Sequence, residues 1–217
     1  MKEKGSAGRT GVQPTLPLQA AAVALLSFWL YRSALPLAYF NDDPTGHFAW
    51  MDGRSVVAFF TGSAAYGYYR PVVFTALRLF EMLFGGGDWP HNPFADHALL
   101  VLLHAANTAL VWALAWRLAG WGPGRAAFAW GAALVFAALP FSYEAVAYVA
   151  SLTHPLVTFL VLVTLLLYQR GARFQVPGAR DKRSSLAPGT WNLAPFFLAL
   201  LTHETGLLAL PALVGVD

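Results

Sequence analysis

Long apolar segments recur along this chain of 217 residues, and they constrain the fold more than any other feature. About 20 mostly apolar residues suffice for a helix to cross the hydrocarbon core of a bilayer. Segments close to this pattern are 16–39, 97–118, 126–139, 145–168 and 191–214. We therefore expect an all-α, polytopic membrane protein with about five transmembrane helices.

The composition favours the same fold class. Apolar residues make up 57% of the chain and charged residues only 12%, whereas charged residues are about 25% of an average soluble domain. The chain has no cysteine, which excludes disulfides and cysteine-based metal or redox sites. The net charge is only +3, and the basic residues cluster between apolar segments, so we expect no nucleic-acid partner.

The basic residues predict the orientation. Cytoplasmic loops carry an excess of Lys and Arg. Three Lys and Arg residues lie in the loop 40–96, and Arg32 lies in the first apolar segment. The other ten would share one side: Lys2, Lys4, Arg9, Arg117, Arg125, Arg170, Arg173, Arg180, Lys182 and Arg183. We expect a cytoplasmic N-terminal tail (1–15), a membrane-embedded module (16–214), an extracytoplasmic loop (40–96) and a cytoplasmic loop (169–190).

Two partly apolar stretches lie in the outer loop. Phe48–Phe60 and Pro71–Phe84 are predicted as helices in or near the membrane interface. The second contains Arg78 and Glu81, so a span that carries polar residues is the alternative. We expect the first apolar segment to remain as an anchor, with a cleaved signal peptide as the alternative. Because the sequence stops after an apolar run, we expect one module of a longer protein.

Adjacent carboxylates follow the first apolar segment at Asp42 and Asp43. One interpretation is structural, because Asp43, Pro44 and Thr45 are suited to begin a helix. The other is functional: a general base, or a ligand of a divalent metal, on the aqueous side of a lipid-accessible cavity. The sequence assigns no cofactor and leaves both interpretations open.

Arg70 lies in the sequence Tyr68-Tyr69-Arg70-Pro71, where the chain returns toward the membrane. An arginine at this level commonly reaches the lipid headgroups, and tyrosines are typical of the interface. The functional alternative is a forked contact between the guanidinium of Arg70 and a lipid-linked phosphate.

Polar residues also lie within the apolar segments. His97, His104 and Asn107 are spaced seven and three residues apart, which predicts one helix face. They either stabilise helix packing or line a functional cavity. Glu144 either begins a helix or faces the same cavity as the aspartates. Glu204 lies in an apolar segment that could consist of two shorter pieces meeting near the outer surface.

The order of these motifs resembles the GT-C membrane glycosyltransferases. Within these enzymes, the chain most resembles the protein O-mannosyltransferase-like group, which includes transmembrane, tetratricopeptide-repeat-containing transferases. The similarity covers roughly Leu16–Pro211. It rests on the Asp pair, Tyr-Tyr-Arg-Pro, His97 with His104-x-x-Asn107, a Pro followed by Glu-Ala-Val, and a Thr-x-Glu segment before a Pro.

The resemblance implies an inverting hexosyltransferase of the GT-C fold, here its N-terminal module. Such an enzyme moves a sugar from a polyprenyl-phosphate donor to a hydroxyl of a protein or glycan acceptor, outside the cytoplasm. It implies a multi-pass protein of the cell membrane, here a bacterial inner membrane. Asp42 would be the general base and Asp43 its supporting acid or ligand. The donor phosphate and substrate would contact Arg70, Tyr69, His97, His104, Asn107, Glu144 and Glu204.

Two other classes remain open from the residues alone. A transporter would use the buried His and Glu residues as a proton or substrate path, and would depend on Glu204 and His104 but not on Asp42. A non-catalytic membrane scaffold is the other alternative.

Overall fold

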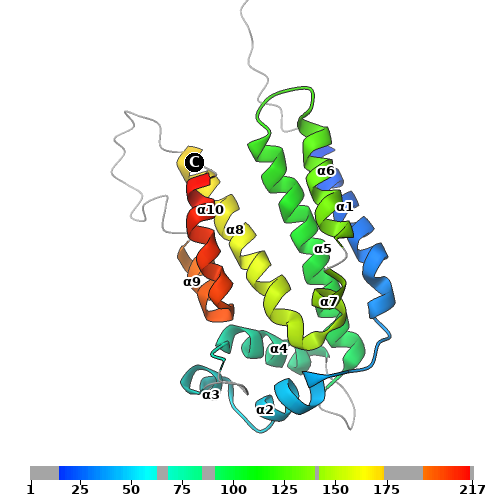
Figure 1. Ribbon diagram of the computed structural model, residues 1–217, viewed down its shortest axis with the longest axis vertical. Coiled ribbons are helices and arrows are strands. Elements are labelled where there is room, and N and C mark those ends of the chain that lie inside the picture. The colour runs from blue at the N-terminus through cyan, green and yellow to red at the C-terminus, as the bar shows by residue number, and fades with distance from the viewer. Residues whose placement is uncertain (1–14, 63–67, 85–90, 140–141, 174–192, 216–217) are drawn as a thin grey trace, which may run out of the picture.

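The computed structural model describes residues 15–62, 68–84, 91–139, 142–173 and 193–215. These residues form helices and connecting turns, with no strand among them, which confirms the all-α prediction. The long helices are α1 (Thr15–Tyr31), α5 (Pro93–Leu118), α6 (Arg125–Ala138) and α8 (Thr153–Arg173). They run side by side along the long axis of the molecule (Figure 1).

Helix α5 is the centre of the bundle, because it contacts α1, α6 and α8. Buried alanines, among them Ala115, Ala129 and Ala133, lie where α1, α5 and α6 meet, and their small side chains let the helices approach closely. Hydrogen bonds add to this packing: Thr108 Oγ1 donates to Ser27 Oγ at 3.0 Å. The result is a tightly packed three-helix unit to which α8 is added.

Six further helical elements lie toward one end of the bundle, in the lower part of Figure 1. They are η2 (Asp43–Phe48, a π-helical turn), α2 (Ala49–Met51), α3 (Val56–Thr61), α4 (Pro71–Phe84), α7 (Ser142–Ala147) and η4 (Val149–Leu152). Helix α4 buries Val73, Phe74 and Leu77, whereas its apolar side chains Met82 and Leu83 are exposed. Its buried face packs with α2, α3, α5 and η4 in one apolar cluster, which fixes this layer against the bundle.

The C-terminal segment bends at the same end. Helix α9 (Leu193–Thr202) descends along α8, η5 (Glu204–Leu208) turns the chain, and α10 (Ala209–Gly215) rises again (Figure 1). The predicted segment 191–214 is therefore two shorter pieces that meet at His203 and Glu204, as the alternative interpretation proposed.

Two of the helical stretches are long and apolar enough to cross a membrane: Pro93–Leu118 and Val149–Arg170. The structure thus supports two candidate spans, whereas about five were predicted. The segment 16–39 is helical only to Tyr31 and then forms η1 (Arg32–Ala34). Pro36 accounts for this end, because it lacks an N–H and its ring clashes with the carbonyl four residues earlier.

The stretch Phe48–Phe60 is not the single interfacial helix that was predicted. Its helical pieces are separated at residues 52–55, where Gly53 has a φ of 70°. Such a backbone conformation is readily adopted by glycine and ends a helix. Pro71–Phe84 forms one helix, as predicted.

Candidate functional site

A strained turn presents Asp42 at the covered end of the bundle. Asn41, just before it, has a φ of 55°, which is rare for a residue other than glycine. The N–H of Asp42 donates to the Tyr148 hydroxyl at 3.3 Å, a contact between residues 106 positions apart. The side chain of Asp42 is partly exposed. The turn therefore holds the Asp42 backbone beside Tyr148 and leaves the Asp42 side chain partly exposed.

Asp43 has a different environment. Its side chain is fully buried, its Oδ1 accepts from the N–H of Ala150 at 2.6 Å, and its Oδ2 accepts from the N–H of Phe40 at 3.4 Å. Burial raises the pKa of Asp43, while these N–H donors lower it. The carboxylate thus connects the turn at 40–43 to η4, a contact that the sequence did not predict.

Arg70 is held just before α4. Its Nη2 lies 3.6 Å from Oε1 of Glu204, and its guanidinium carbon lies 4.4 Å from the centre of the Tyr68 ring. Its Nε is buried and has no hydrogen-bond partner among the described residues. The side chain is 17% exposed. A half-satisfied guanidinium at a solvent-facing edge is suited to bind an anion.

The bend between α9 and η5 brings two histidines to Arg70. The Nε2 of His203 lies 3.3 Å from the same Oε1 of Glu204 that contacts Arg70. The ring of His154, at the start of α8, lies 5.4 Å from the ring of His203. Glu204 itself is 66% exposed. Residues far apart in the sequence therefore share one solvent-facing edge.

His47 connects the two halves of this edge. Burial and the charge of Arg70 lower its pKa, whereas the charge of Asp42 raises it. Both charges are thus close enough to act on one imidazole, which packs 5.5 Å from the Phe74 ring. We call the group of Asp42, His47, Arg70, His154, His203 and Glu204 the open cluster.

Two further predicted site residues lie near this cluster. The Tyr69 hydroxyl donates to the carbonyl of Phe60 at 3.0 Å, so Tyr69 ties α3 to the segment that carries Arg70. Glu144 is exposed in the first turn of α7, and its charge acts on His154.

His97, His104 and Asn107 lie inside the bundle. All three are buried on α5, as the spacing predicted. Asn107 donates to the carbonyl of Pro155 at 2.8 Å, and the His104 ring packs between Tyr31 and Phe136. Their contacts are with neighbouring helices and not with the open cluster.

A second cluster of charged residues includes two side chains of α4. His91 contacts Oε1 of Glu81 through Nδ1 and Oδ1 of Asp52 through Nε2, the latter at 3.1 Å. Arg78 lies 3.8 Å from Glu81 and donates to the carbonyl of Met51 at 2.7 Å. Burial lowers the pKa of His91, but the contacts with the two carboxylates raise it above its usual value. We call Asp52, Arg78, Glu81 and His91 the closed cluster.

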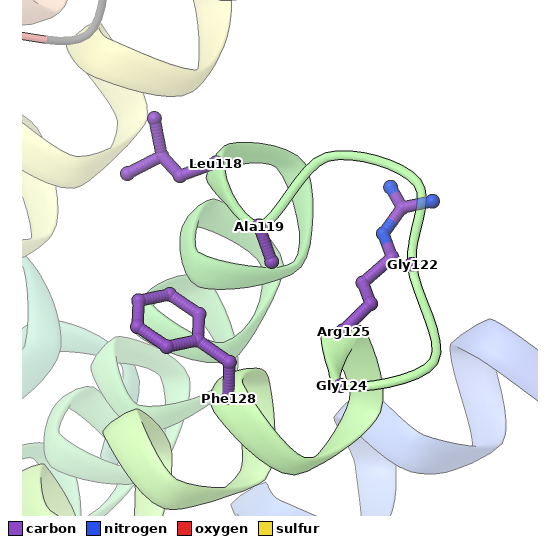
Figure 2. A pocket seen from close by; sticks show the side chains of 6 residues that line it. All are labelled: Leu118, Ala119, Gly122, Gly124, Arg125 and Phe128. Carbon is purple, nitrogen blue, oxygen red and sulfur yellow. The ribbon is translucent and has the colours of Figure 1, made fainter.

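Metal binding is not apparent in the described part of the chain, where no group of three or more His, Asp or Glu residues is arranged to hold an ion. At the opposite end of the bundle, the turn between α5 and α6 encloses a shallow depression of about 410 Å³ (Figure 2). Its lining is mostly apolar, with Arg125 at one side, and it lies far along α5 from the open cluster.

Comparison with known proteins gives no relative: no family model, curated protein or solved structure matches the chain.

Sequence reasoning left several residues of these sites out of its candidates: His47, His154, His203, Tyr148, Asp52, Arg78, Glu81 and His91. His47 and His91 carried one usable signal, since each is a lone histidine in a loop rich in acids. Tyr148 carried none, because a tyrosine near a helix start is common at an interface. Its role depends on a partner that only the fold brings close.

Proposed function

We propose that this protein is a membrane glycosyltransferase. It transfers a sugar from a polyprenyl-phosphate donor to an acceptor hydroxyl on the extracytoplasmic side, with the open cluster as its active site. In this proposal about five segments cross the membrane, two of which are the long apolar stretches Pro93–Leu118 and Val149–Arg170.

The separation of charge supports this orientation. Arg117, Arg125 and Arg170 lie at one end of the bundle, whereas both clusters lie at the other. Cations gather on the cytoplasmic side of membrane proteins. Large apolar side chains are exposed along the flanks of the helices, including Leu18, Leu25, Trp29, Phe128 and Val135, and such side chains suit contact with lipid.

One observation carries the proposal: the partly exposed carboxylate of Asp42 and the guanidinium of Arg70, which contacts the exposed Glu204, lie at the same end of the bundle. Transfer from a lipid phosphate needs both groups. A base must take the proton of the acceptor hydroxyl, and a cation must stabilise the charge on the departing phosphate.

The chemistry balances with these two residues. The acceptor oxygen forms a bond to the anomeric carbon of the sugar as its proton passes to Asp42. The bond between that carbon and the phosphate oxygen breaks, and polyprenyl phosphate leaves with the electron pair beside Arg70. Attack opposite the leaving group inverts the anomeric carbon. Because phosphate is a stable leaving group, no strong general acid is required.

The test is transfer from a panel of labelled polyprenyl-phosphate sugars in membranes that contain the full chain. We expect wild-type protein to transfer one sugar and Arg70→Gln to lose at least tenfold in kcat/KM, since it removes a charge-assisted contact. Arg54→Gln is the matched control, because Arg54 is exposed and bonds only to the Trp50 carbonyl and ring. Equal loss in both variants, or no transfer from any donor, would contradict the proposal.

A further inference from the structure

Glu204 occupies the place where an anionic ligand would meet Arg70. Its Oε1 lies between the Arg70 guanidinium and the His203 ring, 3.6 Å from one and 3.3 Å from the other. A single oxygen shared by two nitrogen donors is also how a phosphate oxygen is bound.

The protonation of His203 is fixed by its neighbours. Its Nδ1 accepts from the N–H of Thr205 at 3.1 Å, so this nitrogen carries no proton. A neutral imidazole has its proton on the other nitrogen, here Nε2, which faces Glu204. His203 is therefore oriented to donate a hydrogen bond toward the anion beside Arg70.

Close packing holds this arrangement in place. A Cβ on Gly206 would lie 2.7 Å from the carbonyl carbon and oxygen of Ala199, closer than side chains tolerate. Glycine thus lets η5 lie directly on α9, which fixes His203 and Glu204 relative to the bundle. The carboxylate of Glu204 nevertheless remains 66% exposed, so it can swing into solvent without leaving a buried charge.

We propose that Glu204 is a displaceable internal anion, and that the donor phosphate takes its place on Arg70 and His203. This inference rests on the proposed function and deepens it: His203 becomes a phosphate-binding residue, and Glu204 a competitor instead of a ligand. When transfer is complete, the returning carboxylate favours release of polyprenyl phosphate.

Removing the competitor strengthens phosphate binding. An exposed ion pair contributes up to about 1 kcal/mol, which corresponds to about a fivefold change in affinity. We therefore expect Glu204→Gln to bind polyprenyl phosphate about fivefold more tightly than the wild type. Arg70→Gln should bind it at least tenfold more weakly, because it removes the cation.

The experiment measures binding of undecaprenyl phosphate to the purified full chain in nanodiscs. Asp52→Asn is the matched control for Glu204→Gln, since Asp52 is also a half-exposed carboxylate beside a histidine, at 3.1 Å. Its affinity should equal that of the wild type. The same preparations are assayed for transfer.

The outcomes separate the two proposals. Tighter binding by Glu204→Gln alone supports the inference. Equal or weaker binding by Glu204→Gln, in a protein that binds and transfers, overturns the inference and leaves the glycosyltransferase intact. Failure of every form to bind or transfer contradicts both.

Discussion

Two histidine–carboxylate contacts at the same end of the molecule have nearly the same length but differ in what else surrounds the histidine. His91 lies 3.1 Å from Asp52, and His203 lies 3.3 Å from Glu204. Both nitrogens of His91 meet carboxylates, and its ring stacks 3.9 Å from Phe48. The carboxylate beside His203 is exposed and shared with Arg70. His91 and Glu81 of the closed cluster are each only 4% exposed, whereas Glu204 of the open cluster is 66% exposed beside Arg70.

This difference teaches that contact geometry alone does not identify a site. A group of paired charges with a buried centre fixes the positions of the segments that carry it, here the end of α2, α4 and the residues just before α5. An exposed, incompletely paired group contributes little to stability and is available for chemistry. The predictions below test whether stability and activity separate between the two clusters.

The largest effect on stability is expected in the closed cluster. His91→Leu leaves the buried carboxylate of Glu81 with only Arg78, and breaking a buried ionic group costs about 3–5 kcal/mol of unfolding free energy. Denaturant unfolding in detergent measures the change. A loss below about 1 kcal/mol would show that the cluster is not a structural anchor.

Asp43→Asn should destabilise the protein by about 1.5–3 kcal/mol, the range for hydrogen bonds to a charged group. Transfer should fall as well, because the turn that presents Asp42 loosens. Asp42→Asn is the matched comparison: its side chain is partly exposed, so stability should be unchanged while transfer is lost. Equal stability losses in both would contradict the division of roles between these neighbours.

The pH dependence of stability should follow His91. Because its folded pKa is raised above 6.5, the protonated form stabilises the fold. This stabilisation is complete below the unfolded pKa and is lost as the pH rises through the folded pKa. The melting temperature should therefore fall as the pH rises above 6.5, and this slope should be smaller in His91→Gln. An identical slope in the variant would assign the effect to other groups.

The smallest effect is expected in the open cluster. Glu204→Gln should change the unfolding free energy by no more than about 0.5 kcal/mol, because its ion pairs are exposed to solvent. Thermal unfolding with the same detergent measures it. A loss as large as that of His91→Leu would remove the contrast between the clusters.

The sequence predicted what depends on local patterns. Runs of mostly apolar residues located α5, α6 and most of α8, and the partly apolar stretch 71–84 located α4; the predicted segment 145–168 begins in α7 and passes through η4 before α8. Helix ends within apolar stretches were harder to predict. The end of α1 before Pro36 and the interruption at Gly53 both fall in stretches whose apolar content is continuous.

The sequence identified several residues of the site but not the contacts between them. Asp42, Arg70 and Glu204 were singled out by spacing, and the fold brings Arg70 and Glu204 into contact across 134 positions. The hydrogen bond from the Ala150 N–H to Asp43 joins residues 107 positions apart. Its donor is a main-chain N–H, and no residue type in the sequence indicates such a donor. The pairing of His91 was missed for the same reason, since Glu81 and Asp52 are brought to it only by the fold.

The most direct test of the central claim is sugar transfer by Asp42→Asn beside Asp52→Asn, in membranes with equal amounts of inserted protein. These acids lie ten positions apart, one in each cluster. The account predicts that Asp42→Asn lowers the rate about 10²–10⁴-fold, the loss typical of a general base, and that Asp52→Asn stays within about twofold of the wild type. Transfer that survives Asp42→Asn, or falls equally in both variants, would contradict it.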